Sequence, residues 1–130
     1  MNSAYFEKRL ASSESLDELA MVLEILLSGG YGVWEGNQIY NIRQLVDSIN
    51  GLRIEIFSRE HAPPHFHILK GDINATFSIS DGHHLNGTIG NREKALVAWW
   101  FAHSQAKLVR IWNETRPTGC QVGPIHISGA

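Results

Sequence analysis

The sequence contains the stretch HFHILKGDINATFSI at residues 65–79, and this stretch decides the fold. Apolar and polar side chains largely alternate on both sides of its centre, where residues 70–72 predict a tight turn. Alternation with a period of two is typical of strands that bury one face and expose the other. We therefore predict two antiparallel strands joined at this turn.

Two neighbouring segments extend the predicted hairpin into a sheet. Residues 52–57, LRIEIF, alternate until their last two positions and predict a strand before it. A turn at Asp81-Gly82 is followed by a short strand near residues 85–89. The result is an antiparallel meander of about four strands, which we expect helices to cover on one side.

The residues before the meander predict an N-terminal helical unit with a small hairpin. A capping box in the first four positions of residues 15–28 precedes leucines at helical spacing, and predicts a helix there. Residues 31–40 are typical of a short hairpin. Apolar residues at helical spacing then predict a second helix over residues 42–49, with Asn41 as its N-cap.

After the meander, the sequence predicts helical structure up to a tail without pattern. We expect Asn91 to cap a helix that runs through residue 101, and a break near residues 103–104. Residues 107–114 continue the helical pattern, and residues 115–130 form the tail. The predicted fold class is therefore α+β.

The length and composition predict one globular domain over residues 1–130, made of an N-terminal unit (1–50), a core (52–114) and the tail. Hydrophobic residues make up 43% of the chain and charged residues 18%, as in a water-soluble protein. We see no signal peptide and no membrane span, and Cys120 is the single cysteine. These observations favour the cytoplasm and exclude a disulfide-stabilised fold.

The charge is unevenly distributed along the chain. The net charge is −2, which argues against strong non-specific binding of nucleic acid. Residues 91–116 nevertheless carry five basic and two acidic side chains, a local net charge of +3. Either this segment is an ordinary solvated helix face, or it forms a weak surface for phosphate groups or an acidic partner. The residues that we expect to contact nucleic acid are Lys70, Arg92, Lys107 and Arg110.

Three histidines cluster at the start of the central stretch, next to two prolines. His61 precedes Pro63-Pro64, which keep it off any helix shared with the other two histidines, His65 and His67. Residues two apart on a strand point to the same side, so His65 and His67 should be neighbours. The strand alternation predicts one common polar face, consisting of Arg53, Glu55, His65, His67, Asn74, Thr76 and Ser78.

This predicted face is compatible with three kinds of function. His61, His65 and His67 could act as general acid and base with Arg53, Glu55 or Lys70 beside them, as in a ribonuclease-type site. The same three histidines could instead bind a divalent transition metal such as Zn²⁺, Mn²⁺ or Ni²⁺. In that case Glu55 or the pair at residues 83–84 could complete the ligand set. The third alternative is a binding surface without chemistry.

The central segment also resembles a bacterial family called domain of unknown function 4160, over about residues 52–114. The residues that carry the resemblance are Phe57, His61, PPHFH (63–67), ATF (75–77), Gly82, LNG (85–87), Ala95-Leu96, Trp99, His103, Leu108 and Trp112. The chain departs from the family where Ile89-Gly90 replaces the usual Leu-Pro before the helix.

The resemblance implies that the three histidines matter, and it implies a partner. Members of the family are often encoded beside another small domain, domain of unknown function 2442, a pairing that has prompted suggestions of a toxin–antitoxin system. Our leading expectation is a component of such a module, or of a defence module, that acts on RNA or nucleotides through the histidines. The alternatives are a metal-binding domain and a non-catalytic interaction module. In the interaction module, the helix of residues 15–28 would bind a cognate protein or a second copy of the chain.

Overall fold

Four antiparallel strands form the sheet that the sequence predicts. The computed structural model describes residues 2–41, 51–56, 63–115 and 125. Neighbouring strands follow one another in the chain, as in a meander. The strands are β3 (Arg53–Glu55), β4 (His65–Lys70), β5 (Ile73–Ser78) and β6 (His84–Thr88). The predicted turn at residues 70–72 joins β4 to β5, and Gly71 there has a φ of 55°.

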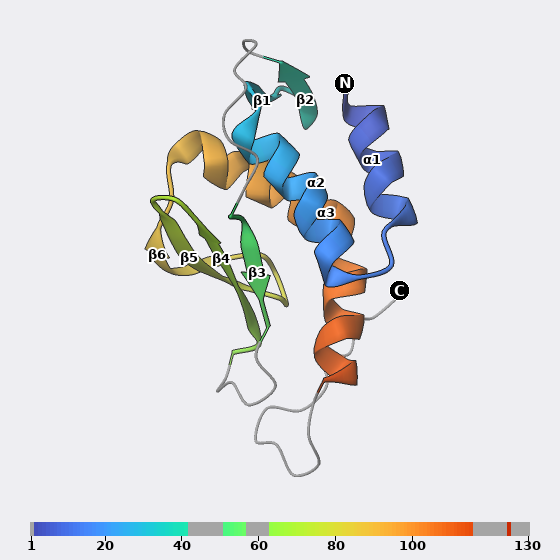
Figure 1. The fold of residues 1–130 in the computed structure, drawn as a ribbon, viewed down its shortest axis with the longest axis vertical. Coiled ribbons are helices and arrows are strands. Elements are labelled where there is room, and N and C mark those ends of the chain that lie inside the picture. The colour runs from blue at the N-terminus through green and yellow to red at the C-terminus, as the bar shows by residue number, and fades with distance from the viewer. Residues whose placement is uncertain (1, 42–50, 57–62, 116–124, 126–130) are drawn as a thin grey trace.

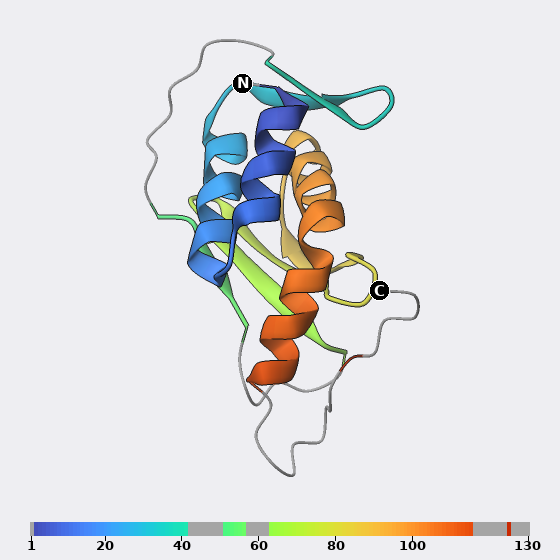
Figure 2. The ribbon, with the colours of Figure 1, turned by 90° about the vertical axis from the view of Figure 1, so that its right-hand side faces the viewer.

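Three helices lie on one side of this sheet, so the α+β prediction is confirmed. They are α1 (Ser3–Ser12), α2 (Leu16–Ser28) and α3 (Asn91–Glu114). In Figure 1, α2 and α3 form a layer beside the sheet, and α1 lies beyond them. Figure 2 views the same layers from the helical side. A second, two-stranded sheet pairs β1 (Tyr31–Trp34) with β2 (Gln38–Asn41), as predicted for residues 31–40.

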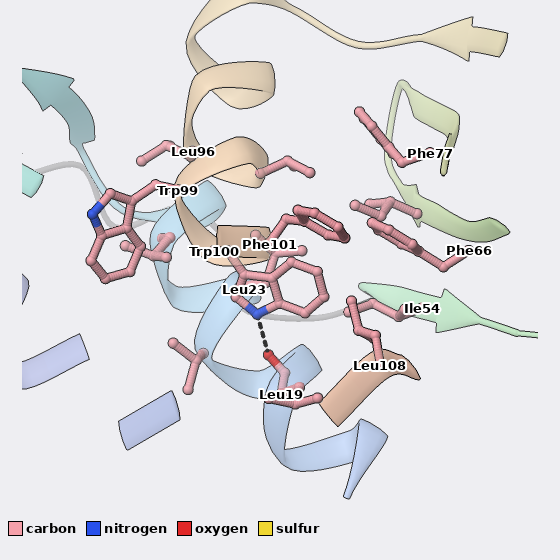
Figure 3. Close-up of a cluster of buried hydrophobic side chains, with 14 of the residues drawn as sticks. Leu19, Leu23, Ile54, Phe66, Phe77, Leu96, Trp99, Trp100, Phe101 and Leu108 are labelled. Carbon is pink, nitrogen blue, oxygen red and sulfur yellow. Dashed lines mark hydrogen bonds between the residues drawn. The ribbon is translucent and has the colours of Figure 1, made fainter. Parts of the chain in front are cut away.

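The core lies between the inner face of the sheet and the layer of α2 and α3 (Figure 3). Phe66 of β4 is fully buried at its centre. Its ring stacks on Phe77 of β5 at 5.6 Å and on Phe101 of α3 at 5.9 Å, centroid to centroid. Trp100 of α3 is also fully buried, and its indole Nε1–H donates to the Leu19 carbonyl of α2 at 2.9 Å. This contact fixes α2 and α3 together directly above the sheet.

Helix α2 begins where the capping box predicts. The Ser15 hydroxyl accepts a hydrogen bond from the Glu18 amide at 3.2 Å, and the Glu18 carboxylate accepts one from the Glu14 amide at 3.3 Å. The apolar residues of this helix are buried in the chain's own core; they are Leu19, Val22, Leu23, Leu26 and Leu27. That apolar face is therefore buried within the chain, and binding of a partner or a second copy through this helix stays a prediction.

The helical predictions need three corrections. Helix α3 is continuous from residue 91 to residue 114, without a break near residues 103–104. Its N-cap is Gly90 rather than Asn91, and no side chain caps it. Helix α1 was not predicted at all, although its fully buried Phe6 and Leu10 lie four residues apart. The helix is only ten residues long and has few large apolar side chains, so its pattern in the sequence is short.

Some predictions fall on residues that the structure does not describe. These are the helix over residues 42–49, the position of His61, and most of the tail. Asn41, predicted to cap that helix, is the last residue of β2. No helix in the described part of the chain has both the length and the apolar character needed to span a membrane.

Candidate functional site

The outer face of the four-stranded sheet, away from the helices, carries the polar side chains that the sequence placed together. On the inner face, Ile54, Phe66, Ile68, Ala75 and Phe77 are buried. The strand register aligns the outward residues in rows across the sheet. One row joins Glu55, His67 and Thr76, and a second joins Arg53, Leu69 and Asn74. His65 lies opposite Ser78 in a third.

His65 is the most constrained member of this face. It is only 5% exposed, although the sequence placed it on the solvated side of the sheet. Its ring Nδ1 lies 2.7 Å from the Pro63 carbonyl oxygen. Because a carbonyl can only accept, Nδ1 carries the proton in this contact. The backbone is held as well, since the Ile79 amide donates to the Pro64 carbonyl at 3.0 Å.

His67 lies beside His65 and at the centre of the polar row. The two imidazole centroids are 5.1 Å apart, with the ring planes inclined by 50°. Glu55 of β3 and Thr76 of β5 are the residues directly opposite His67 on either side, and all three are half-buried. Directly opposed side chains have Cβ atoms about 5 Å apart, so carboxylate, imidazole and hydroxyl are close neighbours. Sequence reasoning predicted this juxtaposition correctly.

Strand β6 adds two residues that the sequence analysis did not include. Asn86 pairs with Thr76, and Thr88 pairs with Asn74, so both rows continue across all four strands. Both residues are exposed. The pairing between β5 and β6 shifts register between Thr76 and Phe77, which interrupts the simple alternation. The predicted strand near residues 85–89 was the signal that could have found them.

Lys70 and His84 belong to other parts of the sheet than the histidine pair. Lys70 pairs with Ile73 at the end of β4 away from His65. It lies two residues after the buried Ile68, so its side chain is on the same side of the strand as Ile68 and on the opposite side from His67. Lys70 therefore does not lie beside the histidines, in contrast to the prediction from the sequence. His84 is half-buried in β6, and its ring stacks on the inward-facing Phe77 at 5.1 Å. His84 thus lies on the inner side, away from His65 and His67.

The three candidate cations of α3 contact other helices rather than the histidine face. Arg92 donates to the carbonyls of Tyr31 at 2.6 Å and Leu27 at 3.1 Å, close to the C-terminal end of α2. Lys107 Nζ donates to three carbonyls at the end of α1, namely those of Leu10 at 2.5 Å, Ala11 at 2.8 Å and Ser13. Cations are favourable at helix C-termini, where carbonyl groups lack partners within the helix.

Arg110 lies near the connection between α1 and α2. It donates to the Glu14 carbonyl at 3.3 Å and lies 3.9 Å from the Glu114 carboxylate. Arg92 and Lys107 are fifteen positions apart, so they are separated by about 22 Å along the helix. The structure does not bring the predicted nucleic-acid contacts together, because they are spread along α3 and directed at α1 and α2.

The predicted metal site is described only in part. Among the described residues, no three side chains of His, Cys, Asp or Glu lie close enough together to hold a metal ion. His65 and His67 would supply two ligands, and the third, His61, lies outside the described residues. The three-histidine site therefore stays a prediction.

Comparison with known proteins identifies the family of the central segment. The family model described as "Domain of unknown function (DUF4160)" matches residues 51–113. This segment contains the whole four-stranded sheet and nearly all of α3, and the match confirms the predicted resemblance to this family over just under half of the chain. Searches of curated proteins and of solved structures gave no match.

Proposed function

We propose that the outer face of the sheet binds RNA or a nucleotide, and that His65 and His67 act on it as general acid and base. In this proposal the protein is a component of a toxin–antitoxin-like or defence module with a cognate partner protein. The observation that supports it most is the oriented, buried His65 next to His67, 5.1 Å between ring centroids. Imidazole is the side chain best suited to proton transfer near neutral pH.

The neighbouring groups fit roles in the cleavage of a phosphodiester. One imidazole would take the proton from a ribose 2′-hydroxyl, whose oxygen attacks phosphorus. The other would protonate the departing 5′-oxygen as its bond to phosphorus breaks. Glu55, directly opposite His67, would orient that ring, and Arg53, one row away and exposed, would balance charge on the phosphate oxygens.

The other side chains of the rows favour a small or short ligand. Thr76 and Asn86 continue the row of His67 with groups that can donate and accept hydrogen bonds. In the part of the chain that the structure describes, Arg53 is the candidate cation on the outer face, and Arg92 and Lys107 lie elsewhere. A ligand that relies on few specific contacts suits this face better than a long duplex, which requires many phosphate contacts.

The test compares histidine variants with a matched histidine control. His65→Ala and His67→Ala, alone and together, are measured for growth inhibition on expression and for cleavage of short RNA and nucleotides. His83→Ala, an exposed histidine in the turn before β6, is the control. We expect the site variants to lose about 100-fold or more in rate, as is typical when an acid or base is removed. Wild-type rates in the double variant, or an inactive wild type, would contradict the proposal.

Metal binding is the second candidate, and one specific observation favours it. A histidine that ligates a metal typically donates its other ring N–H to a carbonyl or carboxylate, as His65 does to Pro63. His65 and His67 would then be joined by His61. Elemental analysis of protein purified without a histidine tag tests this candidate. A content near one equivalent that falls in His65→Ala supports it, and a content below about a tenth of an equivalent refutes it.

A further inference from the structure

The β1–β2 hairpin presents an aromatic pair on its outer side, away from α1 and α3. Trp34 is 62% exposed, whereas the other three tryptophans, Trp99, Trp100 and Trp112, are at most 4% exposed. Its ring contacts Tyr40 edge-on, with the centroids 5.2 Å apart and the planes 79° apart. An indole that stays exposed loses a large free energy of burial, so an exposed Trp34 held against the half-buried Tyr40 requires an explanation.

The strand register explains why the two rings meet. Gly32 pairs with Tyr40, and Trp34 pairs with Gln38, so these four residues share the outer face of the hairpin. Because Gly32 has no side chain, it leaves room between Trp34 and Tyr40, which are diagonal neighbours. The inner face carries Tyr31 and Ile39, both of which are buried in the core.

The hairpin is held rigidly behind this pair. The Ser3 hydroxyl of α1 accepts from the Ile39 amide at 2.6 Å and donates to the Ile39 carbonyl at 3.5 Å. The Trp99 indole of α3 donates to the Asn37 carbonyl in the turn at 2.8 Å. A surface fixed in this way loses little conformational entropy when it binds a partner.

The charge around the pair favours a cationic partner. Glu35, next to Trp34, is the single charged residue of residues 31–41. A carboxylate beside an exposed indole attracts positive charge, and indole is the best aromatic platform for an ammonium or guanidinium ion.

We infer that Trp34, Tyr40 and Glu35 form a docking site for arginine or lysine side chains in a basic segment of a partner protein. The site lies outside residues 51–113, so it is not part of the segment that the family model matches. It is independent of the histidine face, because the hairpin and the four-stranded sheet are separate sheets.

The test uses a labelled hexa-arginine peptide, with binding followed by fluorescence anisotropy at physiological ionic strength. Trp34→Ala should weaken binding about two- to fivefold, the range of an exposed cation–π contact. Glu35→Gln should also weaken it, whereas Glu14→Gln, the same charge change between α1 and α2, should not. Figure 1 places that connection at the opposite end of α2 from the hairpin. Trp34→Phe, which keeps an aromatic ring, should lie between the wild type and Trp34→Ala.

Several results would overturn the inference. Equal affinity of wild type and Trp34→Ala would show that the peptide binds through general charge alone, and absence of binding would exclude the site. If a hexaproline peptide binds instead in a Trp34-dependent manner, the site recognises proline rather than cations. Trp34-dependent self-association in light scattering would assign the surface to a second copy of the chain. Circular dichroism of each variant establishes that the fold is retained.

Discussion

Lys107 distinguishes a structural from a nucleic-acid-binding role for the cations of α3. Its ammonium group donates to the carbonyls of Leu10, Ala11 and Ser13, which end α1. Hydrogen bonds from a charged donor contribute about 1.5–3 kcal/mol each when buried. Lys107 is half-buried, and partial hydration of the carbonyls offsets much of this, so we expect Lys107→Met to lower the free energy of unfolding by about 2.5 kcal/mol in total.

Methionine suits this comparison because it keeps the length and helix propensity of lysine and removes only the charge and the donors. Lys94→Met, an exposed position in the first turn of α3, is the control and should change the free energy by less than about 0.5 kcal/mol. Urea unfolding followed by circular dichroism gives both values, and the melting temperature of Lys107→Met should fall by about 10 °C. If both variants unfold alike while RNA binding is lost in Lys107→Met alone, the capping argument is wrong.

Three further predictions test the packing of the sheet and helices. Gly87→Ala should cost about 3 kcal/mol or more in urea unfolding, because φ is +92° and the added Cβ would lie 2.0 Å from the Asn74 carbonyl oxygen; wild-type stability would contradict this close approach. Trp100→Phe should lower the free energy of unfolding by about 2 kcal/mol, because it leaves a cavity and removes the hydrogen bond to the Leu19 carbonyl. A loss below about 0.5 kcal/mol would refute the importance of this contact. A fragment of residues 51–130 should show no cooperative thermal transition in calorimetry, because α2 no longer covers the sheet; a sharp transition would count against this.

Local signals in the sequence were sufficient for most elements. The capping box set the start of α2, and the period of two set β4 and β5, because these signals depend on near neighbours in the chain. The start of α1 has an equally local cap, since the Asn2 side chain accepts from the Tyr5 amide at 3.1 Å. The helix was missed because distant contacts stabilise it, with Lys107 at its C-terminal end.

The sequence predicted on which face of the sheet the candidate site lies, but not how deeply its residues are buried. Alternation placed His65 and His67 on one face with Glu55, and the strand register confirms this. The 5% exposure of His65 was not predictable, because alternation says which side a residue faces and not what covers that side. The strand predicted near residues 85–89 could have placed Asn86 on the sheet, but its pairing with Thr76 depends on the register shift between Thr76 and Phe77, which no local pattern indicated.

The cations of α3 illustrate a limit of charge counting. A net charge of +3 over residues 91–116 suggested a phosphate surface, yet Arg92 and Lys107 direct their charge at the carbonyl ends of α2 and α1. A sequence window sums charges without knowing which helix ends lie beside them. Counting therefore overestimates the positive surface wherever basic side chains cap neighbouring helices.

The two faces of the four-stranded sheet differ in what they need from the rest of the chain. The inner face needs a helical cover, and the outer face needs only the pairing of its strands. The inner face is apolar and is covered in part by α2, which lies outside residues 51–113. Because β3 to β6 and α3 alone would leave Ile54 and Trp100 partly uncovered, we expect this segment to need α2 in order to fold. The outer face, with His65 and His67, needs no such cover to keep its rows in register. The inner face thus depends on α2 for its cover, whereas strand pairing alone aligns the rows of the outer face.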